Sequence, residues 1–247
     1  MALVRRGYDR MRVLLIIPAY NEEANIAETL RQVEQFHDLP PNTELHYLVV
    51  NDGSTDATAE ICDQNGLHTA ELSCNLGIGG AVQTGYRYAY RHDYDAAVQF
   101  DGDGQHDISS LPTLLSALEE ADLVIGSRFA GEETFRSTAL RRVGIRLLSA
   151  LIRVTTGLRV LDCTSGYRAA NRRVIAQFQR DYPQDYPEPE SIVQLAAQGC
   201  RVREVPVKMR ERAGGQSSIR AWKSALYMIK VSLAIVVASI GRKETGR

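Results

Sequence analysis

The chain contains 247 residues, of which 24% are charged and 44% are hydrophobic. These proportions are typical of a folded globular protein, and they exclude a disordered chain and a miniprotein that needs disulfides or metals to fold. The net charge of −1 conceals an asymmetry, because residues 201–247 carry 11 lysines and arginines against three acidic residues. A basic C-terminal stretch predicts an anionic partner there, such as phosphate groups, a membrane surface or nucleic acid.

The cysteines and the N-terminal residues indicate the compartment. No CxxC pair is present, which argues against a zinc ribbon or a thioredoxin-like site among Cys62, Cys74, Cys163 and Cys200. We predict free buried thiols in a reducing cytoplasm. The first apolar run, residues 13–17, is too short for the core of a signal peptide, and no small-residue cleavage site follows it.

Strands and helices are predicted to alternate over the first half of the chain, after a flexible arm at residues 1–11. Short apolar runs bounded by turn residues predict strands at 12–17, 44–50, 67–72, 95–100 and 122–126. Apolar residues at helical spacing predict helices at 24–36, 55–65, 79–91 and 109–120. This alternation predicts an α/β fold in which helices flank a mostly parallel sheet.

The second half of the chain departs from this alternation. Its patterns predict a basic helix at 136–157, a strand-like stretch at 160–170 and a loop rich in Pro, Tyr and acidic residues at 181–190. They then predict a helix at 191–198, a strand at 201–209 and a Gly/Ser loop at 213–218. Pro206 places the last of these strands at a sheet edge. Without a low-complexity linker, we expect one domain at 12–216 followed by an extension at 217–247.

The extension is predicted to contain an amphipathic helix. Residues 222–240 are mostly apolar, and as a helix they would be about 28 Å long, close to a bilayer core of about 30 Å. Lys230 would lie near the middle of such a span, at a cost of about 2.5–3.5 kcal/mol. We therefore expect the helix to lie on a membrane surface or against a small membrane protein. The alternative is a core helix packed on the domain.

Polar side chains follow four of the predicted strands, and ligands bind beyond the carboxyl ends of parallel strands. Asp101 and Asp103, separated by Gly102, can both turn toward one point beyond the fourth strand. Mg²⁺ and Mn²⁺ prefer such carboxylate oxygens and commonly share their coordination with substrate phosphates. An ordinary acidic turn is the alternative for this pair alone, but the polar residues after the other strands favour a metal and diphosphate site.

The other strand ends supply candidates for nucleotide binding. Asp52 can accept a hydrogen bond from a ribose hydroxyl or a base N–H, although Asn-Asp-Gly-Ser also suits a turn. The segment Pro18-Ala19-Tyr20 can lie against a flat ring. Gly79 belongs to a glycine cluster at the start of a helix, where amide groups favour an anion. Neither the dinucleotide-binding glycine fingerprint nor the P-loop is present.

The order of these motifs resembles family 2 glycosyltransferases with the GT-A fold, most closely the branch of dolichyl-phosphate mannosyltransferase and bacterial polyprenyl-phosphate sugar transferases. Eight segments carry the resemblance between residues 12 and 220, namely IPAYNEE, VVNDGSTD, NLGIGGAVQTGY, QFDGDGQHD, GSRF, DCTSGYRAANR, EVPVKM and RERAGGQSSI. The resemblance implies a Rossmann-like, mostly parallel sheet and a hexosyltransferase that uses a nucleotide-diphosphate sugar.

The resemblance also implies roles for individual residues. Asp101 and Asp103 match the DxD signature, and Gln105 matches a metal-proximal glutamine. Arg128 and Arg212 are implied to contact the diphosphate or the sugar. The full set implied to bind the donor is Pro18, Ala19, Tyr20, Glu22, Val50, Asp52, Gly79, Asp101, Gly102, Arg128, Arg212 and Ser218. Because the related mannosyltransferases tend to have Lys at the position of Ser218, the identity of the sugar is not carried over from them.

The implied reaction is displacement at the anomeric carbon of the sugar with inversion, aided by a divalent metal, Asp103 and Arg128, which stabilise the leaving diphosphate. A sugar hydroxyl as nucleophile needs a base, for which Asp162 is the first candidate and Glu188 and Glu190 follow. A polyprenyl phosphate is already anionic, so Asp162 would then only orient it. The alternative role of Asp162 is a helix cap or an ion pair with Arg168.

We rank polyprenyl phosphate first as acceptor, at the cytoplasmic face of the cell membrane, and a lipid-linked saccharide of cell-wall or surface polysaccharide synthesis second. A UDP-sugar is favoured as donor because UDP is the commoner nucleotide among bacterial relatives. A pyrophosphorylase is disfavoured by the acidic PAYNEE segment, and a non-catalytic nucleotide-binding scaffold by the intact polar set. Nucleic acid is not expected, because no aromatic stacking platform accompanies the basic stretch. Homo-oligomer formation and the identity of base and sugar stay open.

Overall fold

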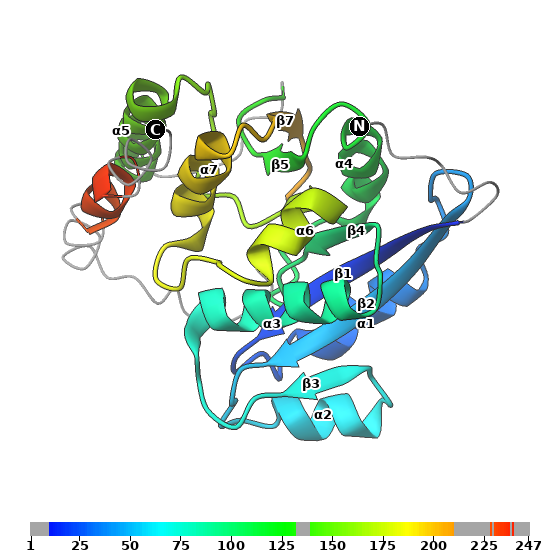
Figure 1. Cartoon of the computed structure of the whole chain (residues 1–247). Helices are drawn as coiled ribbons and strands as arrows, with labels where there is room; N and C mark the ends of the chain where they lie inside the picture. The colour runs from blue at the N-terminus through cyan, green and yellow to red at the C-terminus, as the bar shows by residue number, and fades with distance from the viewer. Residues whose placement is uncertain (1–9, 132–138, 210–227, 229, 238, 240–247) are drawn as a thin grey trace.

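The structure, a computed structural model, describes residues 10–131, 139–209, 228, 230–237 and 239, without the side chains of 139–141. Its centre is a seven-stranded sheet in the order β3-β2-β1-β4-β6-β5-β7 (Figure 1). Most of the predicted arm at 1–11, and Arg212 and Ser218, lie outside the described residues.

The sheet is mostly parallel. Its strands are β1 (Met11–Ala19), β2 (Thr43–Asn51), β3 (Thr69–Glu71), β4 (Ala96–Gln99), β5 (Leu123–Ser127), β6 (Arg168–Asn171) and β7 (Val202–Pro206). Only β6 runs antiparallel to its neighbours, β4 and β5. The predicted α/β fold is confirmed, and β7 forms one edge of the sheet, as its proline indicated.

Helices cover both faces of the sheet and create two cores. They are α1 (Ile26–Glu34), α2 (Thr58–Gln64), α3 (Gly77–Arg91), α4 (Leu111–Ala117), α5 (Ala139–Thr156), α6 (Arg172–Phe178) and α7 (Pro187–Ala197), with a short 3-10 turn at Ile108–Ser110. On β1, Leu14 and Ile16 face the core under α3, α5, α6 and α7, whereas Leu15 and Ile17 face the core under α1 and α4. A strand buried on both faces is therefore continuously apolar, which is why the run at 12–17 was recognisable.

Two expectations for the second half were wrong, and one helix was not predicted. The predicted loop at 181–190 contains the start of α7, because a proline at the first helical position is already in helical geometry. The strand-like stretch at 160–170 becomes β6 only from Arg168 onward. Helix α6 was not predicted, although the Asn171 side chain caps it by accepting a hydrogen bond from the amide of Val174 at 3.1 Å.

The described residues between 228 and 239 are helical. Val231 and Ile235 are buried in the same core as α5, while Leu233 and Val237 are exposed. The described residues of the predicted span 222–240 are thus helical, and their buried side packs on the domain, which corresponds to the alternative of a helix packed on the core. In the described part of the chain, the structure contains no helix with the length and apolarity needed to span a membrane.

All four cysteines are free, as predicted. Cys62, Cys163 and Cys200 are buried, whereas Cys74 is exposed, so the expectation of burial was wrong for Cys74.

Candidate active site

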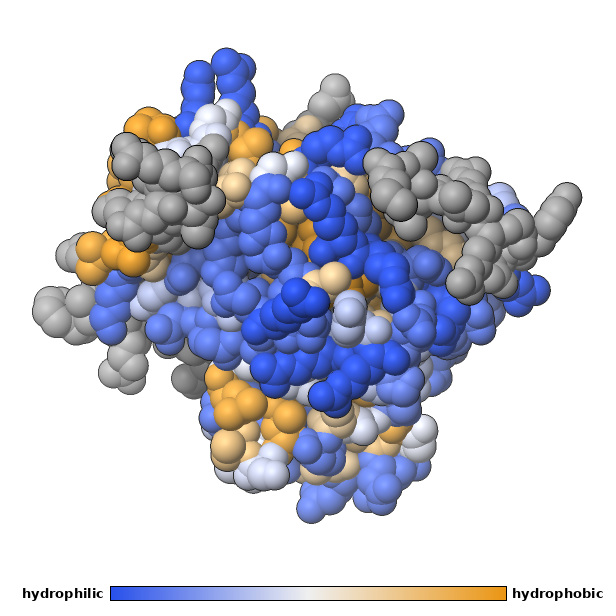
Figure 2. Space-filling view, in the orientation of Figure 1, coloured by the Kyte–Doolittle hydropathy of each residue, from blue (hydrophilic) through white to orange (hydrophobic). Residues whose placement is uncertain are grey.

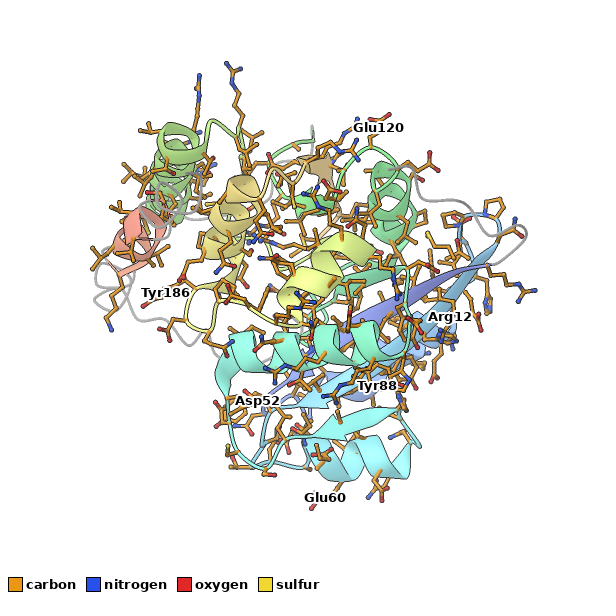
Figure 3. All side chains as sticks on the ribbon, in the orientation of Figure 1. Arg12, Asp52, Glu60, Tyr88, Glu120 and Tyr186 are labelled. Carbon is orange, nitrogen blue, oxygen red and sulfur yellow. The ribbon has the colours of Figure 1, made fainter. Side chains whose placement is uncertain are left out.

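The carboxyl ends of β1 and β2 lie side by side and hold Asp52 in place. Pro18 pairs with Val50 in the parallel register, and the Asp52 amide donates to the carbonyl of Ala19 at 2.9 Å. The buried Asp52 carboxylate accepts a hydrogen bond from the amide of Leu76, just before α3, at 2.7 Å. In Figure 3, Asp52 lies below the beginning of α3, at the opposite end of the sheet from Arg12. The carboxyl ends of β1 and β2 and the start of α3 therefore hold Asp52 in place.

The other residues expected to bind the nucleoside differ in exposure. The Tyr20 side chain is 47% exposed at the end of β1, where it can contact a ring. Pro18, Ala19 and Val50 are buried, so a ligand would meet their main chain. The carbonyl of Glu22 accepts from the amides of Asn25 and Ile26, and its carboxylate accepts from the Asn25 side chain, so Glu22 holds the turn that leads into α1.

Gly79 lies in the first turn of α3, packed against the segment before α7. A Cβ atom at this position would lie 2.4 Å from the carbonyl oxygen of Gln184 and 2.5 Å from that of Pro183. The close approach of two backbones explains this glycine without a ligand.

Two side chains orient the Asp101 carboxylate, which is 34% exposed beyond the end of β4. The Gln99 amide donates to Oδ1 at 3.2 Å, and Nε2 of His106 lies 3.4 Å from Oδ2. The main chain is held as well, because the Asp101 amide donates to Nδ1 of His106 at 2.9 Å. Gly166 comes so close that a Cβ atom would lie 3.0 Å from Oδ2. Asp101 is thus presented to solvent in one orientation.

His106 is a buried residue that our sequence analysis did not assign. Its ring stacks on Tyr167, with 4.6 Å between centroids and 11° between planes. Burial lowers the pKa of His106, and the nearby Arg128 acts in the same direction, whereas Asp101 and Asp103 oppose it. Because Nδ1 accepts the Asp101 amide, we place the proton of the neutral ring on Nε2, facing the carboxylate. The only signal in the sequence was its place directly after the DxD loop.

The remaining residues of the DxD loop are compatible with a divalent cation that is bound by the protein and a substrate together. The amide of Gln105 donates to the Asp103 carboxylate at 3.0 Å, and Gly102 packs beneath the carbonyl of Pro18. Among the described residues, no group of three His, Cys, Asp or Glu side chains could hold a metal alone. Asp101 and Asp103 offer two partly exposed carboxylates, whose oxygen atoms are the ligands that Mg²⁺ and Mn²⁺ prefer. They suit an ion whose other ligands come from a diphosphate and water.

Arg128 and Asp162 form a buried ion pair at the end of β5. The guanidinium Nε and one terminal nitrogen donate to the two carboxylate oxygens at 2.7 and 2.6 Å, and the Arg128 amide donates at 3.0 Å. Asp162 is fully buried and Arg128 is 8% exposed. The alternative partner suggested for Asp162, Arg168, is wrong. Arg168 instead donates to the carbonyl oxygens of Cys163, Ser165 and Glu188.

Glu204 on β7 holds the loop that carries Asp162. Its carboxylate accepts the amides of Leu161 and Asp162 at 2.6 and 2.7 Å. Burial raises the pKa of Glu204, although these hydrogen bonds oppose the shift. The role of Glu204 was not predicted, although this residue opens the EVPVKM segment, because the amides that it binds lie more than 40 residues earlier in the chain.

Glu188 and Glu190 lie in the first turn of α7, which places acidic side chains at the positive end of a helix. Burial raises the pKa of both, and the charge of Asp185 raises that of Glu190 further. The pKa of Glu188 also responds to Arg168, Asp101 and Arg128. The structure therefore brings the start of α7, the DxD loop and the buried ion pair within electrostatic range of one another.

Comparisons with known proteins identify the family. The family model described as glycosyl transferase family 2 matches residues 14–178. The chain belongs to glycosyl transferase family 2. This glycosyltransferase is 33% identical over 218 residues to an undecaprenyl-phosphate mannosyltransferase of Micrococcus luteus, an alignment that covers 85% of this chain and 88% of the relative. It is 32% identical over 232 residues to a polyprenol monophosphomannose synthase of Mycolicibacterium smegmatis, covering 90% and 86% of the two chains.

Solved structures confirm the GT-A fold of the glycosyltransferase. Glucosyl-3-phosphoglycerate synthase from Mycobacterium tuberculosis, in complex with Mn²⁺, uridine diphosphate and glucosyl-3-phosphoglycerate, matches with a TM-score of 0.67. The match covers 94% of this chain and 80% of that one at 20% identity. At this identity the likeness concerns the fold.

Proposed function

We propose that this glycosyltransferase moves a sugar from a nucleotide-diphosphate sugar, with UDP favoured, to polyprenyl phosphate with inversion at the anomeric carbon. Two relatives that this chain matches over most of their length are named as an undecaprenyl-phosphate mannosyltransferase and a polyprenol monophosphomannose synthase. Their names support a polyprenyl-phosphate acceptor. Complexes of GT-A neighbours with uridine diphosphate and Mn²⁺ or Mg²⁺ support the donor class and a divalent metal.

The observation that carries the choice of acceptor is the buried Arg128–Asp162 pair. A fully buried carboxylate that accepts three hydrogen bonds from one arginine is badly placed to take a proton from an incoming hydroxyl. A phosphate nucleophile is anionic near neutral pH and needs no base. Asp162, the first candidate for a general base, is thus engaged by Arg128. This arrangement is compatible with a phosphate acceptor, because that acceptor needs no base.

The residues beyond the carboxyl ends of the strands have different proposed roles in binding the donor. Asp52 and Tyr20 are proposed to hold the nucleoside. Asp101, oriented by His106, and Asp103 are proposed to hold a Mg²⁺ or Mn²⁺ ion, which when bound supplies positive charge to the leaving diphosphate. Other proposed donor contacts are Pro18, Ala19, Glu22, Val50, Gly79, Gly102, Gln105, Arg128, Arg212 and Ser218.

A lipid-linked saccharide is the second candidate acceptor, and Glu188 is the observation that favours it. A carboxyl group whose pKa is raised by burial, within electrostatic range of Asp101, has the properties of a general base for a hydroxyl. A requirement for Glu188 therefore distinguishes the two acceptors.

We also propose that the enzyme works peripherally at the cytoplasmic face of the cell membrane, since a polyprenyl phosphate is confined to a bilayer. A small membrane protein or a second copy of the chain could contribute to anchoring through the extension at 217–247.

The test uses radiolabelled nucleotide sugars, Mg²⁺ or Mn²⁺, and vesicles that contain polyprenyl phosphate, followed by extraction into organic solvent. We expect metal-dependent, mild-acid-labile label in the organic phase, loss of that label in Asp103→Asn, and activity close to wild type in the control Asp63→Asn on the exposed side of α2. Label in lipid that survives Glu188→Gln supports the phosphate acceptor. Donor turnover only with a saccharide lipid, abolished by Glu188→Gln, would refute it in favour of the second candidate.

A further inference from the structure

Gln99, the last residue of β4, is a polar side chain that faces an apolar core. It is 1% exposed. Because side chains alternate along a strand, it lies on the same face of β4 as Ala97, toward the core under α3, α5, α6 and α7. Its neighbour on β1 is Ile16, which belongs to that core. Figure 2 shows a mainly hydrophilic outer surface over α3 and α6, so the apolar sides of these helices face the sheet. A buried glutamine at this position requires an explanation.

Only half of the Gln99 amide is hydrogen-bonded within the described part of the chain. Nε2 donates to Oδ1 of Asp101 at 3.2 Å, an assignment that follows from chemistry because an ionised carboxylate only accepts. Oε1 is buried, and no described residue donates to it. Arg168, the neighbour of Gln99 on β6, donates to four other acceptors. Since a buried acceptor without a hydrogen bond destabilises a folded protein, Gln99 contributes less to stability than an apolar side chain of similar size would.

Gly166, in the loop before β6, packs against this hydrogen bond. A Cβ atom there would lie 2.9 Å from Nε2 of Gln99, 3.0 Å from Oδ2 of Asp101 and 3.3 Å from Oδ1. The φ angle of Gly166 is not positive, so its backbone conformation does not call for glycine. The side chain is therefore excluded by the space that the amide and the carboxylate occupy. Because both of these groups end flexible side chains, a methyl group would displace them without breaking the sheet.

We infer that Gln99 and Gly166 are positioning residues that hold the Asp101 carboxylate in the orientation in which it binds the divalent cation, an inference that rests on the proposed metal role of Asp101. Oδ1 is held by Gln99, and Oδ2 faces His106. Each carboxylate oxygen keeps a further lone pair for the ion. A ligand that is oriented before the ion arrives loses less conformational entropy on binding, and hydrogen bonds from surrounding side chains orient metal ligands in this way.

The unpaired oxygen distinguishes this role from a structural one, since proteins depart from ordinary core packing mainly at functional sites. Gln83 on α3, also buried, provides the comparison. Its amide donates to the carbonyl of Phe178 at 3.3 Å and accepts from the Gln184 side chain at 3.2 Å. Removing Gln83 takes the donor from the buried Phe178. Removing Gln99 frees only an oxygen of Asp101, which is partly exposed and can bind water. The two glutamines should therefore respond to substitution in opposite ways.

The test compares Gln99→Met, which keeps the length of the side chain, with the matched control Gln83→Met, both in the full chain. Mn²⁺ is titrated in the presence of UDP, or of GDP where the wild type binds GDP more tightly, and the free ion is measured by electron paramagnetic resonance. Since loss of a residue that orients a metal ligand typically weakens metal binding about 10–100-fold, Gln99→Met should show a loss in that range. It should melt at or above the wild-type temperature. Gln83→Met should bind Mn²⁺ as the wild type does and melt at a lower temperature.

Gly166→Ala is an independent variant that should also weaken Mn²⁺ binding, because the methyl group displaces the carboxylate. Saturating Mn²⁺ should restore sugar transfer in both variants, since the ligand is loosened and not removed.

Wild-type affinity for Mn²⁺ in Gln99→Met and Gly166→Ala would overturn the inference. So would a fall in the melting temperature of Gln99→Met as large as that of Gln83→Met, because Gln99 would then be a structural residue. Failure of the proposed function gives a different result, in which the wild type itself binds no Mn²⁺ with either nucleotide.

Discussion

The buried ion pair makes the most direct prediction about stability. In Asp162→Asn the shape of the side chain is kept, but Arg128 loses a carboxylate to which its amide and two guanidinium nitrogens donate. Removing one partner of a buried pair leaves an uncompensated charge and typically costs about 3–5 kcal/mol. Because a domain is stable by only about 5–15 kcal/mol, this substitution should remove a large fraction of the free energy of unfolding.

A matched control is available in the exposed pair of Asp93 and Arg172, whose side chains are 77% and 42% exposed. Asp93→Asn should cost less than about 1 kcal/mol. Asp93 has a φ of +58°, a conformation that asparagine also tolerates, so the backbone does not confound the comparison. Urea unfolding followed by far-ultraviolet circular dichroism measures both variants. If Asp162→Asn unfolds within about 1 kcal/mol of the control but loses transfer activity, Asp162 acts as a base and the reasoning is refuted.

Three further predictions concern packing, charge and hydrogen bonding. Gly79→Ala should cost about 1–3 kcal/mol, because the new methyl group meets rigid backbone oxygen atoms, whereas Gly144→Ala in α5 meets only a flexible methionine and should be close to neutral in the same unfolding assay. Burial alone would raise the pKa of Asp122, but the hydrogen bond from the Arg201 amide and the neighbouring groups lower it below the ordinary value of 3.8. The ionised Asp122 therefore stabilises the folded protein fully above pH 3.8, and this contribution is lost as the pH falls through the pKa of Asp122 in the folded state. Asp122→Asn should therefore destabilise the protein at neutral pH, and the difference should vanish in strong acid; a constant difference would contradict the shift. Arg168→Lys should cost at least about 2 kcal/mol, because lysine cannot reproduce the planar fork that reaches four acceptors, and a smaller loss in urea unfolding would show that those bonds contribute little.

The parts of the fold that were predictable are those in which local pattern and tertiary environment agree. The apolar runs at β1 and β4 are buried on both faces, so no alternation obscured them. Helix α6 is only seven residues long and begins with two arginines, so it offered too few turns for a periodic pattern. The start of α7 was mistaken for a loop because proline, tyrosine and acidic residues suit both a turn and a first helical turn.

The candidate site was predictable where its residues directly follow strands, as Asp52, Asp101 and Asp103 do. What the sequence could not supply is pairing across long separations. An ion pair between Asp162 and Arg168, six residues away, was one alternative for Asp162, yet its partner is Arg128, which is 34 residues earlier in the chain. Such partners become visible only when the antiparallel β6 brings the loop before it against the end of β5.

His106 illustrates the same limit and supports a prediction of its own. Its two ring nitrogens serve the Asp101 amide and carboxylate separately, and the two roles can be separated by substitution. Asparagine places an acceptor near the position of Nδ1, whereas glutamine places an amide nitrogen near that of Nε2. If the main role is to fix the loop backbone, His106→Asn should keep most of the activity and His106→Gln should not. If the main role is to aim the carboxylate, the order should reverse, and the apparent affinity for Mn²⁺ in the presence of nucleotide should fall in His106→Asn at unchanged thermal stability. Equal and small effects of both variants on metal affinity and kcat would show that His106 is only a core residue stacked on Tyr167.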